Sequence, residues 1–168
     1  MRLRLVLSLG ISVLITACAY LGTTTEARHF LGLDVNQRRA ALNDHAPRER
    51  VQLYVEAMVR VRPADLELAD ILASGGSPVV PEIAAQLRRE RRDSAKAFLI
   101  YAILRMEELS YYSAVSNSQL MALMNDATES IEDENWREMA SEFLEGIRST
   151  QHFPHHNGRR AVPISMNS

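Results

Sequence analysis

The only cysteine of the 168-residue chain, Cys18, is the residue whose possible chemistry is most specific. A thiolate is a strong nucleophile, so a single cysteine can be modified selectively. One cysteine also excludes an internal disulfide and every metal site built from several cysteines. An uncharged run over 5–17 leads directly to Cys18, and Arg2 and Arg4 precede that run. A basic start followed by a short apolar run is typical of a bacterial export signal.

The residues at the end of this run are Leu14, Ile15, Thr16, Ala17 and Cys18. This segment resembles the lipobox of bacterial lipoproteins. The resemblance implies that the sulfur of Cys18 receives a diacylglycerol, that the chain is cut before Cys18, and that the new amino group is acylated. One acyl chain holds a protein on a membrane only marginally, whereas several give a stable anchor. We therefore expect a signal peptide over 1–17 and a lipid anchor on Cys18.

Ala19 follows the cysteine, and it determines the expected location. By resemblance to enterobacterial lipoprotein sorting, a residue other than Asp at this position implies transfer to the outer membrane. We expect the protein on the periplasmic face of that membrane, which it contacts through its lipid. An alternative stays open, because Ala17, Cys18 and Ala19 also resemble a small-x-small site for ordinary signal peptidase. Cleavage after Ala19 would leave a soluble periplasmic protein.

Histidines near the C-terminus are the candidate metal ligands of the sequence: His152, His155 and His156. Imidazole nitrogens bind zinc, copper and nickel well. This segment is interrupted by Pro and Gly and has no acid nearby, so we expect weak adventitious binding, no metal site and no cofactor. We predict that 151–168 is a disordered tail, and that His29 and His45 are isolated surface residues.

Familiar catalytic motifs are absent from the sequence, which contains no G-x-S-x-G, H-E-x-x-H, P-loop or G-x-G-x-x-G. Glu107 and Glu108 are adjacent acids, but neighbours on a helix do not face each other. A solvated face is therefore the simpler interpretation of that pair. We predict that the protein is not an enzyme.

Charge is distributed unevenly along the chain. Residues 18–105 contain thirteen basic and eleven acidic residues, whereas 106–150 contains two basic and ten acidic residues. The whole chain has a formal net charge of −2, so nucleic acid is not an expected partner. The basic half would suit anionic lipid headgroups, lipopolysaccharide or an acidic partner, and the acidic segment would suit a basic partner.

The candidate partner-binding residues follow from these two regions. They are Arg88, Arg89, Arg91 and Arg92 in the basic half, and Glu138, Glu142 and Glu145 in the acidic segment. A merely solvated surface is the alternative for both groups.

Helices must position these residues. The chain has only seven Gly and six Pro, and from residue 33 onward apolar residues recur at three- and four-residue spacing. No segment shows the period-two alternation of a strand. We predict one all-α domain over 33–150 with about five to six helices, preceded by a flexible linker over 18–32.

The strongest helical patterns lie at 94–109 and 133–148. Residues 98–104 are apolar on every side, which predicts a central helix, with Asp93 as its cap. In the second segment, Asp133 is the expected cap, and Trp136 and Phe143 are expected to be buried against 98–104. Weaker patterns predict helices over 34–43, from Pro47 to 60, from 63 or 64 to 73, over 79–91, and after 116, where Ser116 and Gln119 suggest a capping box.

Residues 68–108 resemble a HEAT-like repeat: a helix, a glycine turn, a second helix bearing Pro, a polar turn and an apolar third helix. The resemblance implies a stack of such units with an extended binding surface, and an irregular helical bundle is the alternative. We interpret the protein as a lipid-anchored periplasmic scaffold or adaptor that binds another protein of the bacterial cell envelope. Two alternatives stay open: an inhibitor or immunity lipoprotein that blocks a toxic periplasmic enzyme, and an envelope glycan hydrolase with a scattered carboxylate pair.

Overall fold

The computed structural model describes residues 24–150, which form eight α-helices and contain no strand. The all-α class is confirmed, and the helices are more numerous than the five to six expected. They are α2 (Thr25–Gly32), α3 (Val35–Leu42), α4 (Pro47–Arg60), α5 (Glu67–Ala73), α6 (Val80–Arg89), α7 (Asp93–Glu108), α8 (Ser118–Glu129) and α9 (Glu134–Ser149). Within 24–150, no helix combines the length and apolar character that crossing a membrane requires.

Several expectations fall outside the described residues. These are the signal peptide over 1–17, Cys18 with the rest of the lipobox, and the tail with its three histidines at 152, 155 and 156.

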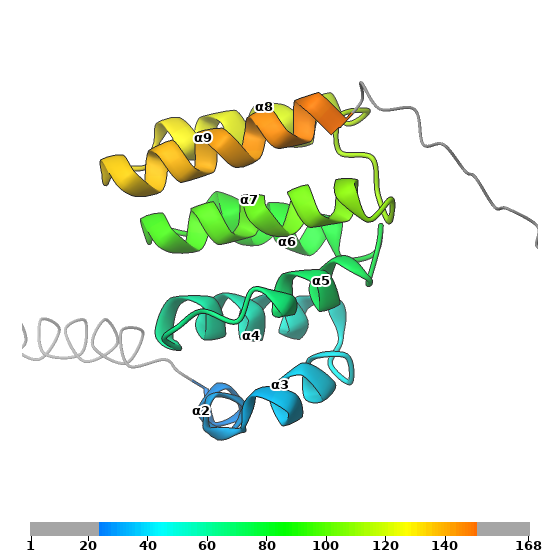
Figure 1. The fold of residues 1–168 in the computed structure, drawn as a ribbon, viewed down its shortest axis with the longest axis vertical. Helices are drawn as coiled ribbons and strands as arrows, with labels where there is room; N and C mark the ends of the chain where they lie inside the picture. Colours follow the sequence, from blue (N-terminus) through cyan, green and yellow to red (C-terminus); the bar gives the residue numbers. More distant parts are fainter. Residues whose placement is uncertain (1–23, 151–168) are drawn as a thin grey trace, which may run out of the picture.

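The helices are stacked in successive pairs that form two layers (Figure 1). In one layer, α3, α5, α7 and α9 pack each on the next, and in the other layer α2, α4, α6 and α8 do the same. Helices α2 and α3 lie at one end of the stack, and α8 and α9 lie at the opposite end. A stack in which each pair packs mainly on its neighbours is the geometry of helical-repeat proteins. The segment 68–108 covers α5, α6 and α7, so it spans one and a half of these pairs.

Helix α7 is central, as its sequence predicts. Eleven of its sixteen residues are buried. It packs against helices of both layers, because α5 and α9 lie beside it in its own layer and α4, α6 and α8 contact it from the other. The hydroxyl of Tyr54 in α4 donates a hydrogen bond of 2.8 Å to the carbonyl of Phe98 in α7, which joins the layers at the centre of the core.

Helix α9 packs on α7 as expected but is buried less deeply. The ring of Trp136 lies edge-on to Phe98, with 5.3 Å between ring centroids, and Phe143 packs against Tyr101 at 5.0 Å. Both α9 rings contact the 98–104 run but stay partly exposed, so their expected burial is confirmed only in part. Because α9 is the last helix of its layer, nothing described covers its outer side, and Met139 is exposed there.

Of the N-terminal caps predicted from the sequence, the cap of α9 is confirmed and those of α7 and α8 are wrong. Asp133 caps α9, since its carboxylate accepts from the backbone N–H of Trp136. Asp93 is the first residue of α7 and not its cap; its carboxylate instead accepts from the backbone N–H groups of Glu132 and Asp133. The cap of α8 is Asn117 rather than Ser116, so the capping box expected there is wrong.

The flexible linker predicted over 18–32 is wrong for its second half, because Thr25–Gly32 is helix α2. Phe30 of α2 is only 2% exposed and belongs to the core. The buried Arg38 of α3 donates hydrogen bonds of 3.2 and 2.7 Å to the carbonyls of Leu31 and Leu33 and so holds the C-terminal end of α2. The helical domain therefore begins before residue 33.

Candidate functional site

A cleft of about 360 Å³ lies between α2, α4 and the C-terminal end of α6. Glu26 of α2 and two acids of α4, Glu49 and Glu56, line it on one side. Arg89 of α6 and Arg92, which directly precedes α7, line it as well. Acidic and basic groups therefore share one cleft, and the contacts of each group decide which of them a ligand can reach.

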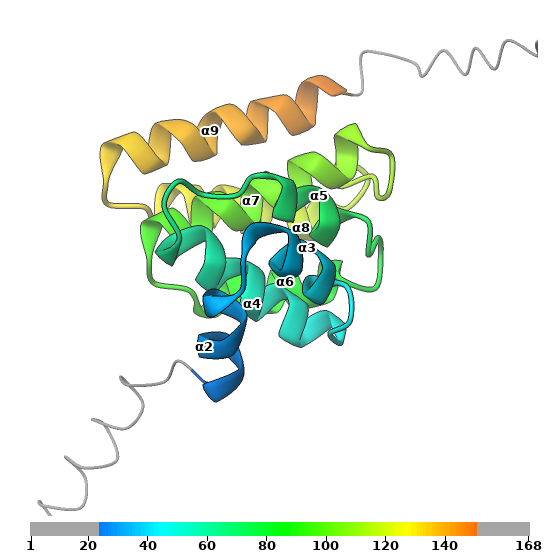
Figure 2. The same cartoon turned by 60° about the horizontal axis from the view of Figure 1, so that its bottom comes forward.

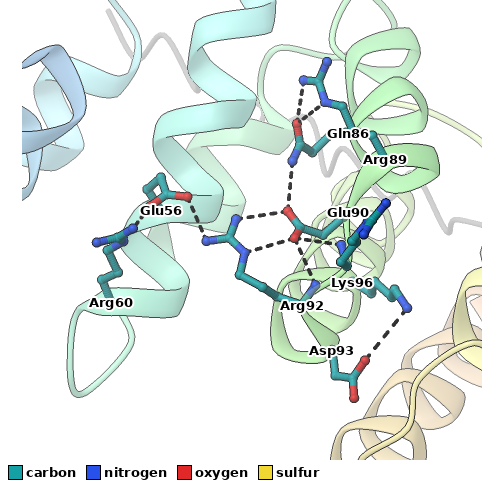
Figure 3. Close-up of polar contacts among 9 residues, drawn as sticks. Glu56, Arg60, Gln86, Arg89, Glu90, Arg92, Asp93 and Lys96 are labelled. Atoms are coloured by element: carbon teal, nitrogen blue, oxygen red, sulfur yellow. Dashed lines mark hydrogen bonds and ion pairs between the residues drawn. The ribbon is translucent and has the colours of Figure 1, made fainter. Parts of the chain in front are cut away.

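Arg92 is fixed in an ion-pair network (Figure 3). Its guanidinium donates to Glu56 at 2.8 Å and to both carboxylate oxygens of Glu90 at 2.9 and 3.0 Å. Glu56 also accepts from Arg60, at 2.6 Å. The network therefore joins α4 to the turn between α6 and α7.

Glu90 is the buried member of this network, with its side chain 6% exposed. It accepts from the side chain of Gln86 at 2.9 Å and from the backbone N–H groups of Arg91 and Arg92 at 3.0 Å. Burial by itself would raise the pKa of Glu90, but the hydrogen bonds and charge of Arg92 lower this pKa to about 2. Glu90 in turn raises the pKa of Arg92. Both groups are charged at neutral pH, and they stabilise the junction of three helices.

The four candidate arginines for partner binding are therefore not equivalent. Arg92 forms its ion pairs within the fold, although its side chain is 38% exposed, and partner binding by Arg92 stays a prediction. Arg89 is exposed but donates to Gln86. Arg88 and Arg91 are exposed and make no ion pair with any residue in 24–150.

Other arginines of the basic half are also used within the fold. Arg39 of α3 makes two hydrogen bonds to Asp65, at 2.9 and 2.7 Å, and these lower the pKa of Asp65. Arg105 of α7 pairs with Asp70 of α5 in the same way and also contacts Glu108. Part of the positive charge of residues 18–105 thus connects neighbouring helices.

The adjacent acids Glu107 and Glu108 point to different environments. Glu107 is buried, and its carboxylate accepts from the backbone N–H of Ala114 at 2.5 Å, which fixes the loop between α7 and α8. Glu108 is exposed beside Arg105. The two do not form an acid–base pair, and a solvated face describes only Glu108.

The acidic candidates on α9 are surface groups. Glu138, Glu142 and Glu145 are all exposed. Glu145 lies 3.7 Å from Arg148, whereas Glu138 and Glu142 form no ion pair with the part of the chain that the structure describes. Their negative charge is therefore available to a partner.

His45 is not the isolated surface residue that the sequence suggested. It is half-buried in the turn before α4, and its ring contacts Phe30. Its Nδ1 lies 3.2 Å from Glu26 and 3.8 Å from Glu49. The four-residue spacing of His45 and Glu49 could have indicated their contact from the sequence. The contact of Glu26 with His45 depends on the position of α2 and could not. His29 is exposed, as expected.

The fold and its surfaces define a class of protein: a stack of helix pairs, in which ion pairs of several basic residues join neighbouring helices and acidic side chains are exposed at one end. Comparison with protein-family models, with curated proteins and with solved structures found no match to this chain.

Proposed function

We propose that this chain is a lipid-anchored periplasmic interaction module, held at the bacterial outer membrane through lipid on Cys18, which binds a basic envelope protein at the outer face of α9. The observation that carries the proposal is the position of that acidic face. It lies at the end of the stack opposite to α2, the described helix that follows Cys18 most closely in the sequence (Figure 1, Figure 2). The HEAT-like interpretation is part of the same proposal.

The anchor sets the orientation. Six residues lie between Cys18 and the start of α2 at Thr25, and the seven Cα–Cα steps across them span at most about 25 Å. The α2 end of the stack is therefore kept near the lipid, and the α9 end is directed away from it. A partner that approaches from the periplasm would reach the acidic face first.

The charges of α9 also support the proposal. In the described part of the chain, nothing packs on the outer side of α9, so a polar face is needed for solubility. A mixture of acidic and basic side chains would be enough to keep this face soluble. The exposed charges on this helix are instead mostly acidic and include Glu138, Glu142 and Glu145. A field of one sign accelerates association with a partner of opposite sign.

Changing Glu138, Glu142 and Glu145 together to Gln tests the docking face. We expect the triple variant to associate more slowly than the wild type with an envelope partner identified by cross-linking. The association rate of the wild type should also fall at least about tenfold between 0.1 M and 1 M salt, since the Debye length shrinks from about 10 Å to about 3 Å. The control changes Asp44 to Asn and Glu82 to Gln, since these two acids lie on another turn and another helix and form no ion pair with the described chain. An association rate that responds to neither salt nor the triple change would contradict a charged docking face.

Replacing Cys18 by Ser tests the anchor separately. A lipoprotein precursor should then accumulate unprocessed and incorporate no labelled palmitate. Normal maturation of the Cys18→Ser chain would instead support cleavage after Ala19. An inhibitor would use the same acidic face on a basic enzyme, and loss of that enzyme's activity in the cross-linked complex would identify this alternative.

A further inference from the structure

Three side chains with metal-ligating atoms converge where α2 meets the start of α4. Glu26 comes from the first turn of α2, His45 from the turn before α4, and Glu49 from the first turn of α4. The Nδ1 atom of His45 lies 3.2 Å from an oxygen of Glu26 and 3.8 Å from an oxygen of Glu49. One ligand atom from each residue lies within 4.8 Å of the other two.

This spacing is close to that of a coordination site. Bonds of about 2.0–2.2 Å from zinc to nitrogen or oxygen place tetrahedral ligands about 3.3–3.5 Å apart. The two carboxylates are each 52% exposed, so they can rotate the short distance that closes the site. An imidazole among the ligands favours zinc and its neighbours over magnesium or calcium, and two carboxylates balance a divalent charge.

The histidine is already held in place. Its ring lies edge-on to Phe30, with 6.3 Å between centroids, and its backbone carbonyl accepts a hydrogen bond from Arg50 at 3.2 Å. Since the imidazole is half-buried and fixed, binding a cation requires ordering of the two glutamates alone. Glu26 and Glu49 also line the cleft, so water can complete the coordination from that side.

We propose that Glu26, His45 and Glu49 bind a divalent transition cation, with Zn²⁺ as the test ion, and that the cation fastens α2 to α4. Helix α2 is short, and its main packing contacts in the described chain are with α3 and α4. A bond from Glu26 through the cation to α4 would stabilise the end of the domain that follows Cys18 most closely in the sequence.

The test is a calorimetric titration of the full chain in detergent with ZnCl₂, after removal of bound metal and alkylation of any free thiol. His152, His155 and His156 are first changed to Asn, so that the tail cannot bind the ion. We expect one Zn²⁺ per chain. Glu26→Gln and Glu49→Gln should each weaken binding by at least about tenfold, since loss of an outer-shell partner alone costs 10–100-fold.

Asp44→Asn is the matched control, because it removes the same charge one residue from His45 and should leave affinity unchanged. Zn²⁺ at a hundred times its Kd should raise Tm by about 5–10 °C in the parent chain and not in Glu49→Gln. The exposure of both glutamates keeps their Gln variants folded. Binding that survives both Gln changes, or that needs the tail histidines, would overturn the proposal. So would a chain that binds no Zn²⁺ and loses stability on His45→Asn, which would show an ion pair only.

Discussion

Helices α7 and α9 are both sixteen residues long and pack against each other, but the fold uses them differently. Eleven residues of α7 are buried, against three of α9. Helix α7 lies between α5 and α9 in its layer, whereas α9 ends that layer. Burial therefore follows position in the stack, and two helices of equal length carry unequal shares of stability.

Their charged residues differ in the same way. In α7, Lys96 donates to the backbone carbonyl and hydroxyl of Ser130, Arg105 pairs with Asp70, and Glu107 accepts from a loop N–H. In α9, Glu138 and Glu142 make no ion pair with the described chain. Charge in α7 serves folding, whereas the acids of α9 are not needed for it. This contrast is the reason to propose partner binding at α9.

The largest expected effect comes from truncating one apolar side chain in each helix. Ile103 of α7 is fully buried, so Ile103→Ala should lower the free energy of unfolding by about 2–5 kcal/mol. Met139 of α9 is 36% exposed, so Met139→Ala should change it by about 0.5 kcal/mol or less. Urea unfolding measures both values. Equal losses would contradict the unequal burial of the two helices.

The second effect concerns Glu90, which lies in the turn before α7 and belongs to the ion-pair network of Arg92. Its folded pKa of about 2 is below the ordinary value of 4.5, so its contribution to stability is complete above about pH 5 and is lost as the pH falls toward 2. Between pH 5.5 and pH 3 this contribution should fall by about 2 kcal/mol. The Glu90→Gln variant lacks it, so its unfolding free energy should depend less on pH in urea titrations at these two values.

Glu138→Gln is the charge-matched control on α9 and should keep the pH dependence of the wild type over this range. A Glu90→Gln variant that loses stability with acid as steeply as the wild type would contradict the role assigned to the Arg92 network.

The sequence was sufficient to predict those helices whose pattern of apolar residues is local. An apolar run over 98–104 predicted the central helix, because a helix apolar on all sides has to be buried on all sides. The stripe of α9 was likewise visible. Helix α2 was missed because eight residues give little periodicity, and part of its stability comes from Arg38 in the next helix. Such contacts depend on the tertiary fold.

The candidate site was less predictable for the same reason. Arg88, Arg89, Arg91 and Arg92 are equivalent by composition, yet only Arg92 reaches Glu56, which lies 36 residues earlier in α4. His45 and Glu26 are brought together by the docking of α2 on α4, which no spacing in the sequence reports. The exposed acids of α9 were predictable, because their exposure follows directly from the opposite, apolar stripe of the same helix.

The smallest expected effect has the opposite sign. Glu138, Glu142 and Glu145 lie three and four residues apart on one exposed side of α9, and like charges at these spacings destabilise a helix by about 0.2–0.5 kcal/mol per pair. Changing all three to Gln should raise the free energy of unfolding by about 0.5 kcal/mol at low salt, even after loss of the weak contact between Glu145 and Arg148. The gain should disappear in 1 M salt, where screening removes the repulsion.

Thermal unfolding at the two salt concentrations measures this difference, with Asp44 and Glu82 changed together as the control at acids that form no ion pair with the described chain. A triple α9 variant that is less stable than the wild type at every salt concentration would mean that these acids serve the fold, as Glu90 does. A variant that is more stable than the wild type but no longer binds its partner would show that these acids serve binding and not folding. The acids of α9 would then be retained at a cost to stability, because binding requires them.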